Sequence, residues 1–411
     1  MRVLVVSPHL KPDTAPTGII ISEILEELGR NGHEIYAITS LPWYERHEVE
    51  EKWVGKGLRK LIQIDVESYG EVARCYPFPF SKKSLIKRGL GFFGFSLMAA
   101  IPALFTRKKF DIVLTISPPL TLGLVGWIAS LRHRCPHVLN IQDVFPDVAI
   151  QVGAVTSPQM IKTFKKLELF CYKKSDAISV LSEDLAENIR SKTETAESQI
   201  IVIPNFVDTQ KIFPSDRLTS YRSELNLDDR IVIMYAGNLG HSQSLNLLLQ
   251  AAKHHQDRED VAYVINGGGV AAQELIEESS DLPNLSVTGF QPETRLSEVL
   301  ASADIHVVLL KRGLGASSLP SKMYSIFAAG RPVIASIDPE TEVSKVLSET
   351  QAGITVKPEE IEDFIEAIER LIDNQTERIE MGAAGRRWVE EQPTAKMVAE
   401  SYENLFKALN K

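Results

Sequence analysis

The segment Pro320-Ser321-Lys322 carries residue types that bind an anion. It stands before an apolar run, 323–329, which Gly330 ends, so a helix is expected to begin near Ser321 and Lys322. At a helix start, a hydroxyl, backbone N–H groups and an ammonium can converge on one anion. A lysine there opposes the helix dipole unless an anion is bound. The segment therefore predicts an anion site, with a solvated surface lysine as the alternative.

Two glycine-containing turns could hold a phosphate. Each follows an expected strand and opens an expected helix: Thr17-Gly18 in the first half of the chain and 236–240 in the second. Glycine lets the N–H groups at a helix start approach a phosphate closely. Such turns are common in α/β proteins, so one alone indicates little. Two in equivalent halves favour the binding of a phosphate chain.

Other motifs exclude several chemistries. The glycines at 266–269 resemble a dinucleotide fingerprint, but 286–288 lacks the acidic residue expected about 20 residues later, so we reject nicotinamide binding. The chain has no D-x-D, P-loop or G-x-S-x-G motif. Its nine histidines show no metal-ligand spacing, and the adjacent His254 and His255 are not expected to share a helix face. No metal site is therefore expected.

The elements that would position these residues alternate between strand and helix. Strands are expected at 2–6, 34–39, 111–116, 137–141, 177–181 and 200–203, then at 231–235, 261–265, 285–287 and 305–309. This alternation indicates parallel sheets with right-handed crossovers. Two such runs, joined near 204–222, predict an α/β fold of two doubly wound, Rossmann-like domains facing a central cleft. Ligands of such sheets bind at the carboxyl ends of the strands.

Composition is that of an ordinary globular protein. The 411 residues allow two domains or more, and 44% hydrophobic with 24% charged residues excludes a disordered or fibrous chain. Three scattered cysteines, Cys75, Cys135 and Cys171, favour a reducing, cytoplasmic compartment. The chain begins without the pattern of a signal peptide. The net charge of −9 argues against a dedicated nucleic-acid binder.

The charge is unevenly distributed. Residues 1–200 carry 25 basic and 22 acidic residues, whereas the remainder carries 20 basic and 32 acidic residues. The stretch 52–134 alone holds 14 basic and 4 acidic residues. This stretch contains an uncharged run, 89–106, flanked by Lys82, Lys83, Lys87 and Arg88, and by Arg107, Lys108 and Lys109. The run is either a buried core helix or an apolar helix in the interface of an anionic membrane. Pro102 and three glycines make a membrane span the least expected alternative.

Short motifs typical of one enzyme family recur along the chain. They are Pro16-Thr17-Gly18, Gly32-His33-Glu34, Ser117-Pro118-Pro119, Gln142-Asp143-Val144-Phe145-Pro146, Ile203-Pro204-Asn205-Phe206-Val207-Asp208, Tyr235-Ala236-Gly237-Asn238-Leu239-Gly240, Thr288-Gly289-Phe290, Pro320-Ser321-Lys322 and Ala328-Ala329-Gly330-Arg331-Pro332. Over essentially the whole chain, these segments resemble the family 4 glycosyltransferases of the GT-B fold. The Q-D-x-x-P and P-S-K variants are most similar to bacterial fucosyl- and N-acetylfucosaminyltransferases that build colanic acid, capsule and O-antigen.

The resemblance implies two domains with separate ligands. Residues 1–205 would bind the acceptor, with a helix at 390–411 packing back on them, and 206–389 would bind the nucleotide-sugar. The implied donor-binding residues are Gly18, Gly237, Asn238, Gly268, Phe290, Gln291, Pro320, Ser321, Lys322 and Glu342. Phe290 and Gln291 would frame the base, largely through backbone groups.

Two departures from the broad family change the implied roles. Its glutamate pair falls on Ser317 and Ser325, so ribose recognition is expected at Glu342. Its basic pair falls on Asn238 and Gln243, so charge on the leaving diphosphate would be stabilised by Lys322 and two helix N-termini.

The implied reaction is sugar transfer with retention at the anomeric carbon, without a metal or other cofactor. The donor would be a UDP- or GDP-sugar, with fucose or an N-acetylated amino sugar as candidates, and the acceptor a lipid-linked or other saccharide at the inner face of the cell membrane. Lys322, Asp143 and Gln142 are the implied catalytic residues; Asp143 could accept the acceptor's proton or simply cap the following turn. The alternatives are another GT-B enzyme, such as a nucleotide-sugar epimerase or a phosphorylase, and a non-catalytic nucleotide-sugar-binding or scaffold subunit.

Overall fold

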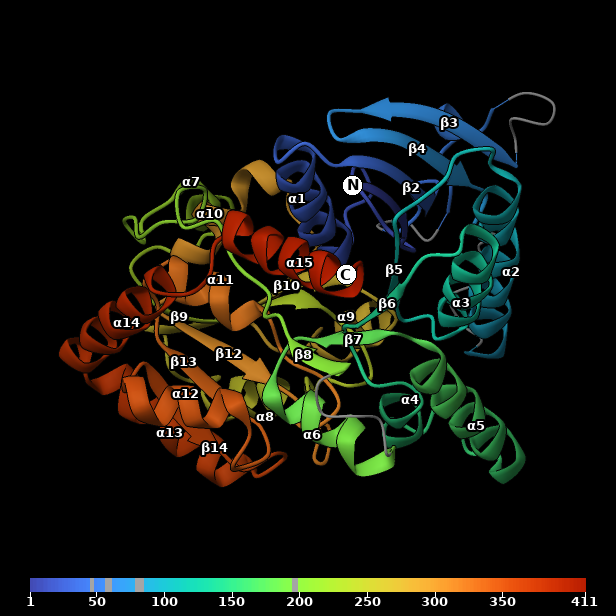
Figure 1. The fold of residues 1–411 in the computed structure, drawn as a ribbon. Helices are drawn as coiled ribbons and strands as arrows, with labels where there is room; N and C mark the ends of the chain where they lie inside the picture. Colours follow the sequence, from blue (N-terminus) through green and yellow to red (C-terminus); the bar gives the residue numbers. More distant parts are fainter. Residues whose placement is uncertain (45–47, 56–60, 78–84, 194–198) are drawn as a thin grey trace. The chain divides into compact units, whose positions relative to one another are not determined.

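The computed structural model describes residues 1–411 except 45–47, 56–60, 78–84 and 194–198, and it leaves the side chains of 85–90 and 92 undescribed (Figure 1). The chain forms two compact units, Met1–Asn205 together with Pro393–Lys411, and Phe206–Gln392. Each unit is built on one largely or wholly parallel sheet. The predicted fold class, two α/β domains on parallel sheets, is confirmed.

The first unit has an eight-stranded sheet in the order β3-β4-β2-β1-β5-β6-β7-β8. Its strands are β1 (Arg2–Val6), β2 (Glu34–Ser40), β3 (Ile62–Glu67), β4 (Gly70–Cys75), β5 (Ile112–Ser117), β6 (His137–Ile141), β7 (Ala177–Val180) and β8 (Ile200–Val202). Neighbouring strands are parallel except β3, which is antiparallel to β4. β5 and β6 are buried along their whole length, as expected for parallel strands covered on both faces.

Helices cover this sheet. They are α1 (Pro16–Arg30), α2 (Leu85–Phe105), α3 (Thr121–His133), α4 (Asp147–Gln151), α5 (Pro158–Lys174), α6 (Glu183–Lys192) and α15 (Ala395–Leu409), with a 3-10 turn at η1 (Glu51–Trp53). The last helix, α15, packs against α1, so the carboxy-terminal end of the chain belongs to the first unit (Figure 1).

The helix α2 is both a core helix and a carrier of exposed apolar side chains. One face buries Phe95, Met98, Ala99 and Ala103 in the core of the first unit. The opposite face exposes Phe93, Leu97, Ile101 and Phe105, spaced four residues apart. The two interpretations left open for 89–106 are therefore not exclusive. Among the described residues, no helix is long and apolar enough to cross a membrane.

The second unit has a six-stranded parallel sheet in the order β11-β10-β9-β12-β13-β14. Its strands are β9 (Ile231–Asn238), β10 (Val261–Gly268), β11 (Leu285–Thr288), β12 (Ile305–Leu309), β13 (Val333–Ser336) and β14 (Gly353–Val356). Its helices are α7 (Ser220–Glu224), α8 (Asn246–His254), α9 (Ala272–Glu278), α10 (Leu296–Ala301), α11 (Lys322–Ala328), α12 (Glu342–Thr350), α13 (Ile361–Asp373) and α14 (Gln375–Glu390), with a 3-10 turn at η4 (Glu293–Arg295). Because the strands are parallel, the carboxyl ends of β9, β10 and β12 share one edge.

The apolar core of this unit explains its helices. In α13, Phe364, Ile368 and Leu371 recur at helical spacing and are buried against the sheet and α8.

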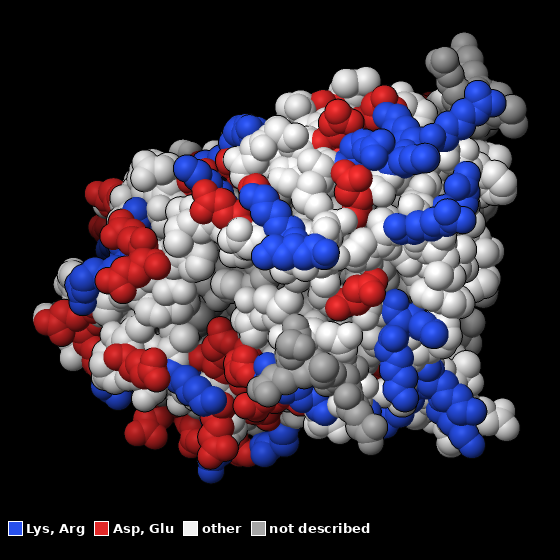
Figure 2. All heavy atoms as spheres, in the orientation of Figure 1, with Lys and Arg blue, Asp and Glu red and all other residues white. Residues whose placement is uncertain are grey.

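On the face drawn in Figure 2, acidic side chains gather over the second unit, as its sequence charge suggests. The rigid sheet edge that carries the loops after β9, β10 and β12 is the part of this unit that positions the candidate site.

Candidate active site

Lys322 is the first residue of α11, and its ammonium lies against a buried tyrosine. The Lys322 Nζ is 3.7 Å from the centroid of the Tyr235 ring and donates a hydrogen bond to the Tyr235 hydroxyl. That hydroxyl in turn donates to the backbone carbonyl of Asn238 over 2.7 Å. The cation–π contact and the hydrogen bond fix the ammonium beside the carboxyl end of β9.

A glycine makes room for this ammonium. Gly237 has a φ of +140°, which side chains rarely adopt, and a Cβ added there would lie 3.0 Å from the Lys322 Nζ. The glycine-containing turn after β9 and the lysine at the start of α11 are therefore brought together, although they are far apart in the sequence.

The charge on Lys322 has no carboxylate partner among the residues that the structure describes. Burial lowers the pKa of Lys322 from 10.5 to about 7, because the cation loses hydration. A bound anion would supply the missing counter-charge and restore the protonated form. The arrangement can thus stabilise a negative ligand at the edge of the sheet.

The glycines at the end of β10 serve two different contacts. A Cβ at Gly267 would lie 1.8 Å from the Gly237 carbonyl oxygen on the neighbouring strand, so this glycine permits strand pairing. A Cβ at Gly268 would lie 2.9 Å from the Phe290 ring. Phe290 is 40% exposed, and its ring covers Gly268, so these two predicted donor-binding residues are in contact.

The loop that carries Phe290 is held by a residue that sequence reasoning missed. The buried Asn266 amide donates to the Tyr221 hydroxyl over 2.9 Å, to the Thr288 hydroxyl over 3.0 Å and to the Gly289 carbonyl over 3.2 Å. The amide of Gln291 also donates to Gly289, over 3.3 Å. The available signal was an asparagine after the apolar run 261–265 and directly before three glycines.

The remaining donor-site predictions lie around α11 and α12. Ser321 precedes α11, its side chain makes no capping hydrogen bond, and the Pro320 carbonyl accepts from the Met323 N–H over 3.3 Å. Glu342 is the first residue of α12, which Thr341 caps. Burial raises the pKa of Tyr324 on α11, and the negative charge of Glu342 raises it further. The carboxylate therefore lies close to α11.

The structure places two of the four replaced family positions, Ser317 and Gln243, in loops at this sheet edge. Ser317 is 1% exposed, in the loop between β12 and α11. The Gln243 side chain accepts a hydrogen bond from the Gly240 N–H over 2.9 Å, so it closes the turn after β9. In that turn, the Lys311 N–H donates to the Ser242 carbonyl over 2.9 Å and ties the loop after β12 to it.

In the first unit, the loops after β1, β5 and β6 share one sheet edge. Sequence reasoning missed a pair there: His9 Nδ1 lies 2.7 Å from Asp13 Oδ2, and both residues are buried. The other oxygen of Asp13 accepts from the Thr14 and Tyr44 N–H groups. The His9 imidazole is thus oriented by a fixed carboxylate. Its position three residues after the end of a buried strand was the available signal.

Gly18 packs against this same histidine. A Cβ at Gly18 would lie 2.9 Å from the His9 Cβ. The carbonyl of Gly18 accepts from the Ser22 hydroxyl over 2.7 Å, and that hydroxyl accepts from the Lys11 N–H over 2.9 Å. Close packing of α1 on the β1 loop therefore accounts for this glycine within the first unit.

The two implied catalytic residues after β6 differ in exposure. The Gln142 side chain is buried and donates to Asn140 over 2.7 Å, and Asn140 donates to the Tyr402 hydroxyl of α15 over 2.9 Å. This geometry favours a positioning role for Gln142. Asp143 is partly buried at the start of the loop. Of the two, Asp143 is therefore the one whose side chain is more accessible.

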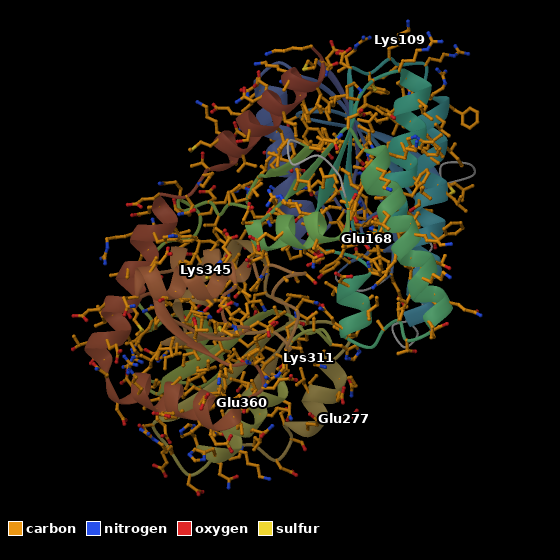
Figure 3. All side chains as sticks on the ribbon, turned by 60° about the horizontal axis from the view of Figure 1, so that its bottom comes forward. Lys109, Glu168, Glu277, Lys311, Lys345 and Glu360 are labelled. Carbon is orange, nitrogen blue, oxygen red and sulfur yellow. The ribbon has the colours of Figure 1, made fainter. Side chains whose placement is uncertain are left out.

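A partly buried ion-pair network holds the segment that follows. Glu168 of α5, labelled in Figure 3, accepts from the Tyr172 hydroxyl over 2.9 Å and from Lys192 over 2.7 Å. The Lys192 ammonium also lies 2.6 Å from Asp147, the first residue of α4. The helix after Asp143 is therefore fixed to α5 and α6.

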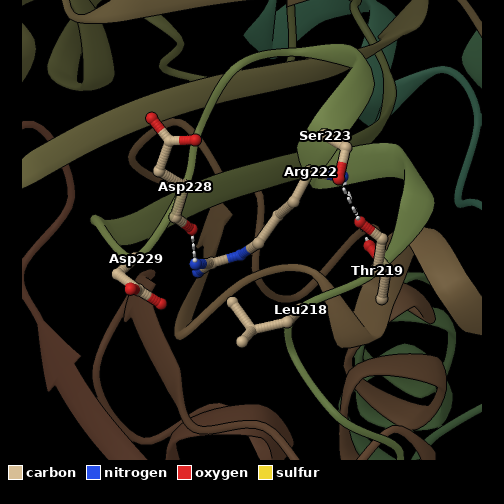
Figure 4. Close-up of a pocket in the computed structure, with 6 residues that line it drawn as sticks. All are labelled: Leu218, Thr219, Arg222, Ser223, Asp228 and Asp229. Carbon is tan, nitrogen blue, oxygen red and sulfur yellow. Dashed lines mark hydrogen bonds between the residues drawn. The ribbon is translucent and has the colours of Figure 1, made fainter.

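A pocket elsewhere in the second unit is structural. It is lined by Leu218, Thr219, Arg222, Ser223, Asp228 and Asp229 (Figure 4). The Arg222 guanidinium donates to the carbonyls of Ser302 and Asp228 over 2.8 Å each and pairs with Asp304. The pocket lies before β9, at the opposite end from Gly237 and Lys322.

Two glycosyltransferase family models match this chain. The model of Glycosyltransferase Family 4 matches residues 17–211, and the model of Glycosyl transferases group 1 matches residues 218–388. The protein named as colanic acid biosynthesis glycosyl transferase WcaI of Escherichia coli is 27% identical, over 90% of this chain and 92% of its own. The glycosyltransferase WbjE of Pseudomonas aeruginosa is 24% identical, over 73% and 74%.

Solved structures share the fold at low sequence identity. Sucrose-phosphate synthase from Thermosynechococcus elongatus is 16% identical and superposes with a TM-score of 0.72. The match includes 100% of this chain and 99% of the synthase chain. HepE of Anabaena, in complex with UDP-glucose, covers 100% of both chains at a TM-score of 0.70 and 14% identity. WaaG, a glycosyltransferase of lipopolysaccharide biosynthesis, has a TM-score of 0.68.

The two family models match consecutive parts of the chain: the first covers β2 to β8 of the first unit, and the second covers β9 to β14 of the second unit. The structure has the fold of the GT-B glycosyltransferases, as expected from the sequence. The chain belongs to the glycosyltransferases that join a family 4 domain to a group 1 domain.

Proposed function

We propose that this glycosyltransferase transfers a sugar from a UDP- or GDP-sugar to a lipid-linked or other saccharide acceptor in cell-surface polysaccharide synthesis. The transfer retains the configuration of the anomeric carbon and needs no metal. Fucose and N-acetylated amino sugars are the candidate donor sugars. The names of WcaI and of WaaG, which refer to colanic acid and lipopolysaccharide biosynthesis, support the surface-polysaccharide role.

One observation carries the proposal: the Lys322 ammonium lies over Gly237 without a carboxylate partner in the described part of the chain. A diphosphate at this edge of the sheet would meet a preformed cation and the N–H groups of a glycine turn. The complex of HepE with UDP-glucose supports a nucleotide-sugar as the ligand. Phe290, which covers Gly268, is the candidate contact for the base, and Glu342, beside α11, for the ribose.

Catalysis would follow from charge development on the leaving group. As the bond between sugar and diphosphate breaks, negative charge grows on the diphosphate oxygens. Lys322 is fixed in place by Tyr235 before the reaction, so it stabilises that charge without reorganisation. A lysine can replace the metal that D-x-D enzymes use, and the chain contains no D-x-D motif.

Proton acceptance from the acceptor would fall to the first unit. Asp143 is the sequence-based candidate, and His9, oriented by Asp13, is a second one. Gln142 and Asn140 would hold the segment that carries Asp143. Replacement of each residue by alanine, with product formation measured at saturating donor, separates the proton acceptor from its supports: the acceptor variant should lose the most turnover.

Peripheral contact with an anionic membrane is the proposed mode of access to a lipid-linked acceptor. The exposed stripe of α2, Phe93, Leu97, Ile101 and Phe105, is followed by the exposed Arg107, Lys108 and Lys109. An apolar stripe beside basic residues suits insertion among anionic headgroups. Lys82 and Lys83, and the side chains of Lys87 and Arg88, lie outside the described residues.

The test is a transfer assay with purified protein, a panel of UDP- and GDP-sugars, EDTA throughout, and polyprenyl-diphosphate sugars as acceptors. We expect release of one nucleotide that depends on the acceptor, together with an α- or β-linkage matching that of the donor. Conversion of the nucleotide-sugar without acceptor would favour an epimerase, and use of phosphate as acceptor a phosphorylase. Binding without turnover under every condition would favour the non-catalytic subunit.

A further inference from the structure

Two adjacent histidines and a glutamate meet at the junction of α8 and α13. His254 is the last residue of α8, His255 follows it, and Glu369 lies on α13. The two histidines do not share a helix face, since α8 ends at His254, but their rings still meet at the end of the helix. The backbone at His255, with φ of −96° and ψ of 17°, turns away, and the two ring centroids lie 4.8 Å apart.

The three potential ligand atoms have the spacing of a metal site. The Glu369 Oε1 lies 3.2 Å from His254 Nε2 and 3.6 Å from His255 Nε2, and all three groups offer atoms within 4.8 Å of one another. Zinc binds nitrogen and oxygen at about 2.1 Å in a tetrahedron, which puts neighbouring ligand atoms about 3.4 Å apart. The two contacts to Glu369 match that value.

The His255 ring is prepared to be a ligand through Nε2. Its side chain is 2% exposed, and Nδ1 lies 3.1 Å from the Ala251 carbonyl oxygen and 2.7 Å from the Tyr263 hydroxyl. In the tautomer with the proton on Nδ1, this nitrogen donates to the Ala251 carbonyl, which only accepts, and Nε2 presents a lone pair. Nε2 is buried without a hydrogen-bond partner in the described part of the chain, since 3.6 Å to Glu369 is too long. Metal-bound histidines show this arrangement.

We propose that His254, His255 and Glu369 bind one zinc ion, with water in the remaining position. The partly exposed His254 and Glu369 leave the site open on one side. Zinc suits two imidazoles and one carboxylate better than magnesium, which prefers oxygen ligands.

The ion acts as a structural link and not in sugar transfer. The helix α8 begins after β9 and spans nine residues, about 13 Å, so its end lies at the opposite edge of the sheet from Gly237. There it precedes β10, and α13 packs alongside. Zinc would join the two helices, and its presence or absence leaves the Lys322 site unchanged.

The test uses the full-length protein, freed of metal by a chelator that is then removed. Zinc chloride is added with magnesium chloride as the comparison, and binding is measured by competition with a zinc indicator and by thermal unfolding. We expect one zinc ion per chain and, at 100-fold excess over Kd, a rise in Tm of about 5–10 °C that magnesium does not give. Cobalt in place of zinc should give the visible absorption of a four-coordinate site.

The variants H254Q and E369Q alter side chains that are about half exposed, so both should fold. Each should weaken zinc binding at least about 100-fold, whereas H241Q, at an exposed histidine of the same unit, should leave it unchanged. Zinc binding that survives in H254Q and E369Q, or the lack of a zinc-dependent Tm rise in the unsubstituted chain, would overturn the proposal. Nucleotide binding, measured on the same samples, reports on the donor site separately.

Discussion

Donor use should fall as the Lys322 ammonium loses its proton. Burial lowers the pKa of this residue in the free protein to about 7, so the charged form that stabilises a diphosphate predominates below that pH. The value of kcat/KM reports the free enzyme. The protonation of Lys322 should therefore leave kcat/KM constant below pH 7. Above pH 7, kcat/KM should fall about tenfold per pH unit, so that at pH 9 it is about 100-fold lower than on the acidic side.

Two substitutions isolate this charge. The variant K322M keeps the length of the side chain and removes the ammonium, so kcat should fall by about 10²–10³ at pH 6.5, or about 2.7–4 kcal/mol of transition-state stabilisation. The variant K322R stays charged at every pH, so its profile should lose the descending limb. Its plateau should be lower, because the larger guanidinium cannot take the place of an ammonium that lies 3.7 Å from the centroid of the Tyr235 ring.

The assay is release of nucleoside diphosphate at subsaturating donor, from pH 5.5 to 9.5, with saturating acceptor. Calorimetry of nucleoside diphosphate binding at pH 8.5, in buffers of different ionisation enthalpy, should show uptake of about one proton, since the bound anion raises the lysine pKa. A wild-type profile without a descending limb, or the same limb in K322M, would refute the reasoning.

Three further predictions concern the two units. The variant G268V should weaken nucleotide binding at least about tenfold with little change in Tm, because a side chain there displaces the exposed Phe290 ring; unchanged affinity in calorimetry would remove Phe290 from the site. Burial lowers the pKa of His137 to about 3 and of His306 to about 4, so each unit binds fewer protons than its unfolded form below pH 6.5. Each of these two histidines should therefore remove about 1.4 kcal/mol of its unit's stability per pH unit from 6.5 towards 4.5, measured by urea titration of each unit's transition, and a flat profile would contradict this. The double variant L97S/I101S should reduce co-sedimentation with anionic vesicles several-fold, whereas I379S, at an exposed residue of the second unit, should not; equal binding of both would dispose of the α2 contact.

The long buried strands were predictable because they are continuous apolar runs. β1, β5, β9 and β10 all fall where the sequence places them, and the helices between them follow from apolar spacing. The hairpin of β3 and β4 was not predicted, since β3 at the edge of the sheet is only partly buried and has no continuous apolar run. β13 and β14 were also not predicted, and their length of four residues does not explain this, since β7 and β11 are equally short and were predicted.

The site was predictable as residue types but not as contacts. Lys322 and Gly237 each stood out in the sequence, yet only the sheet register and the loop after β12 bring them together. Asn266 and the pair of His9 and Asp13 were missed because their partners lie on other loops, which sequence spacing does not encode. Gln142 shows the reverse: its motif is recognisable, but its amide points into the hydrogen-bond network of Asn140.

The most direct test of the central claim is calorimetric titration of the protein with UDP and GDP in EDTA, beside K322M. The account predicts that one of the two nucleotides binds in the presence of EDTA and that K322M weakens that binding at least about tenfold. Binding that is equal in K322M, or that disappears with EDTA, would contradict a metal-free diphosphate site built on Lys322.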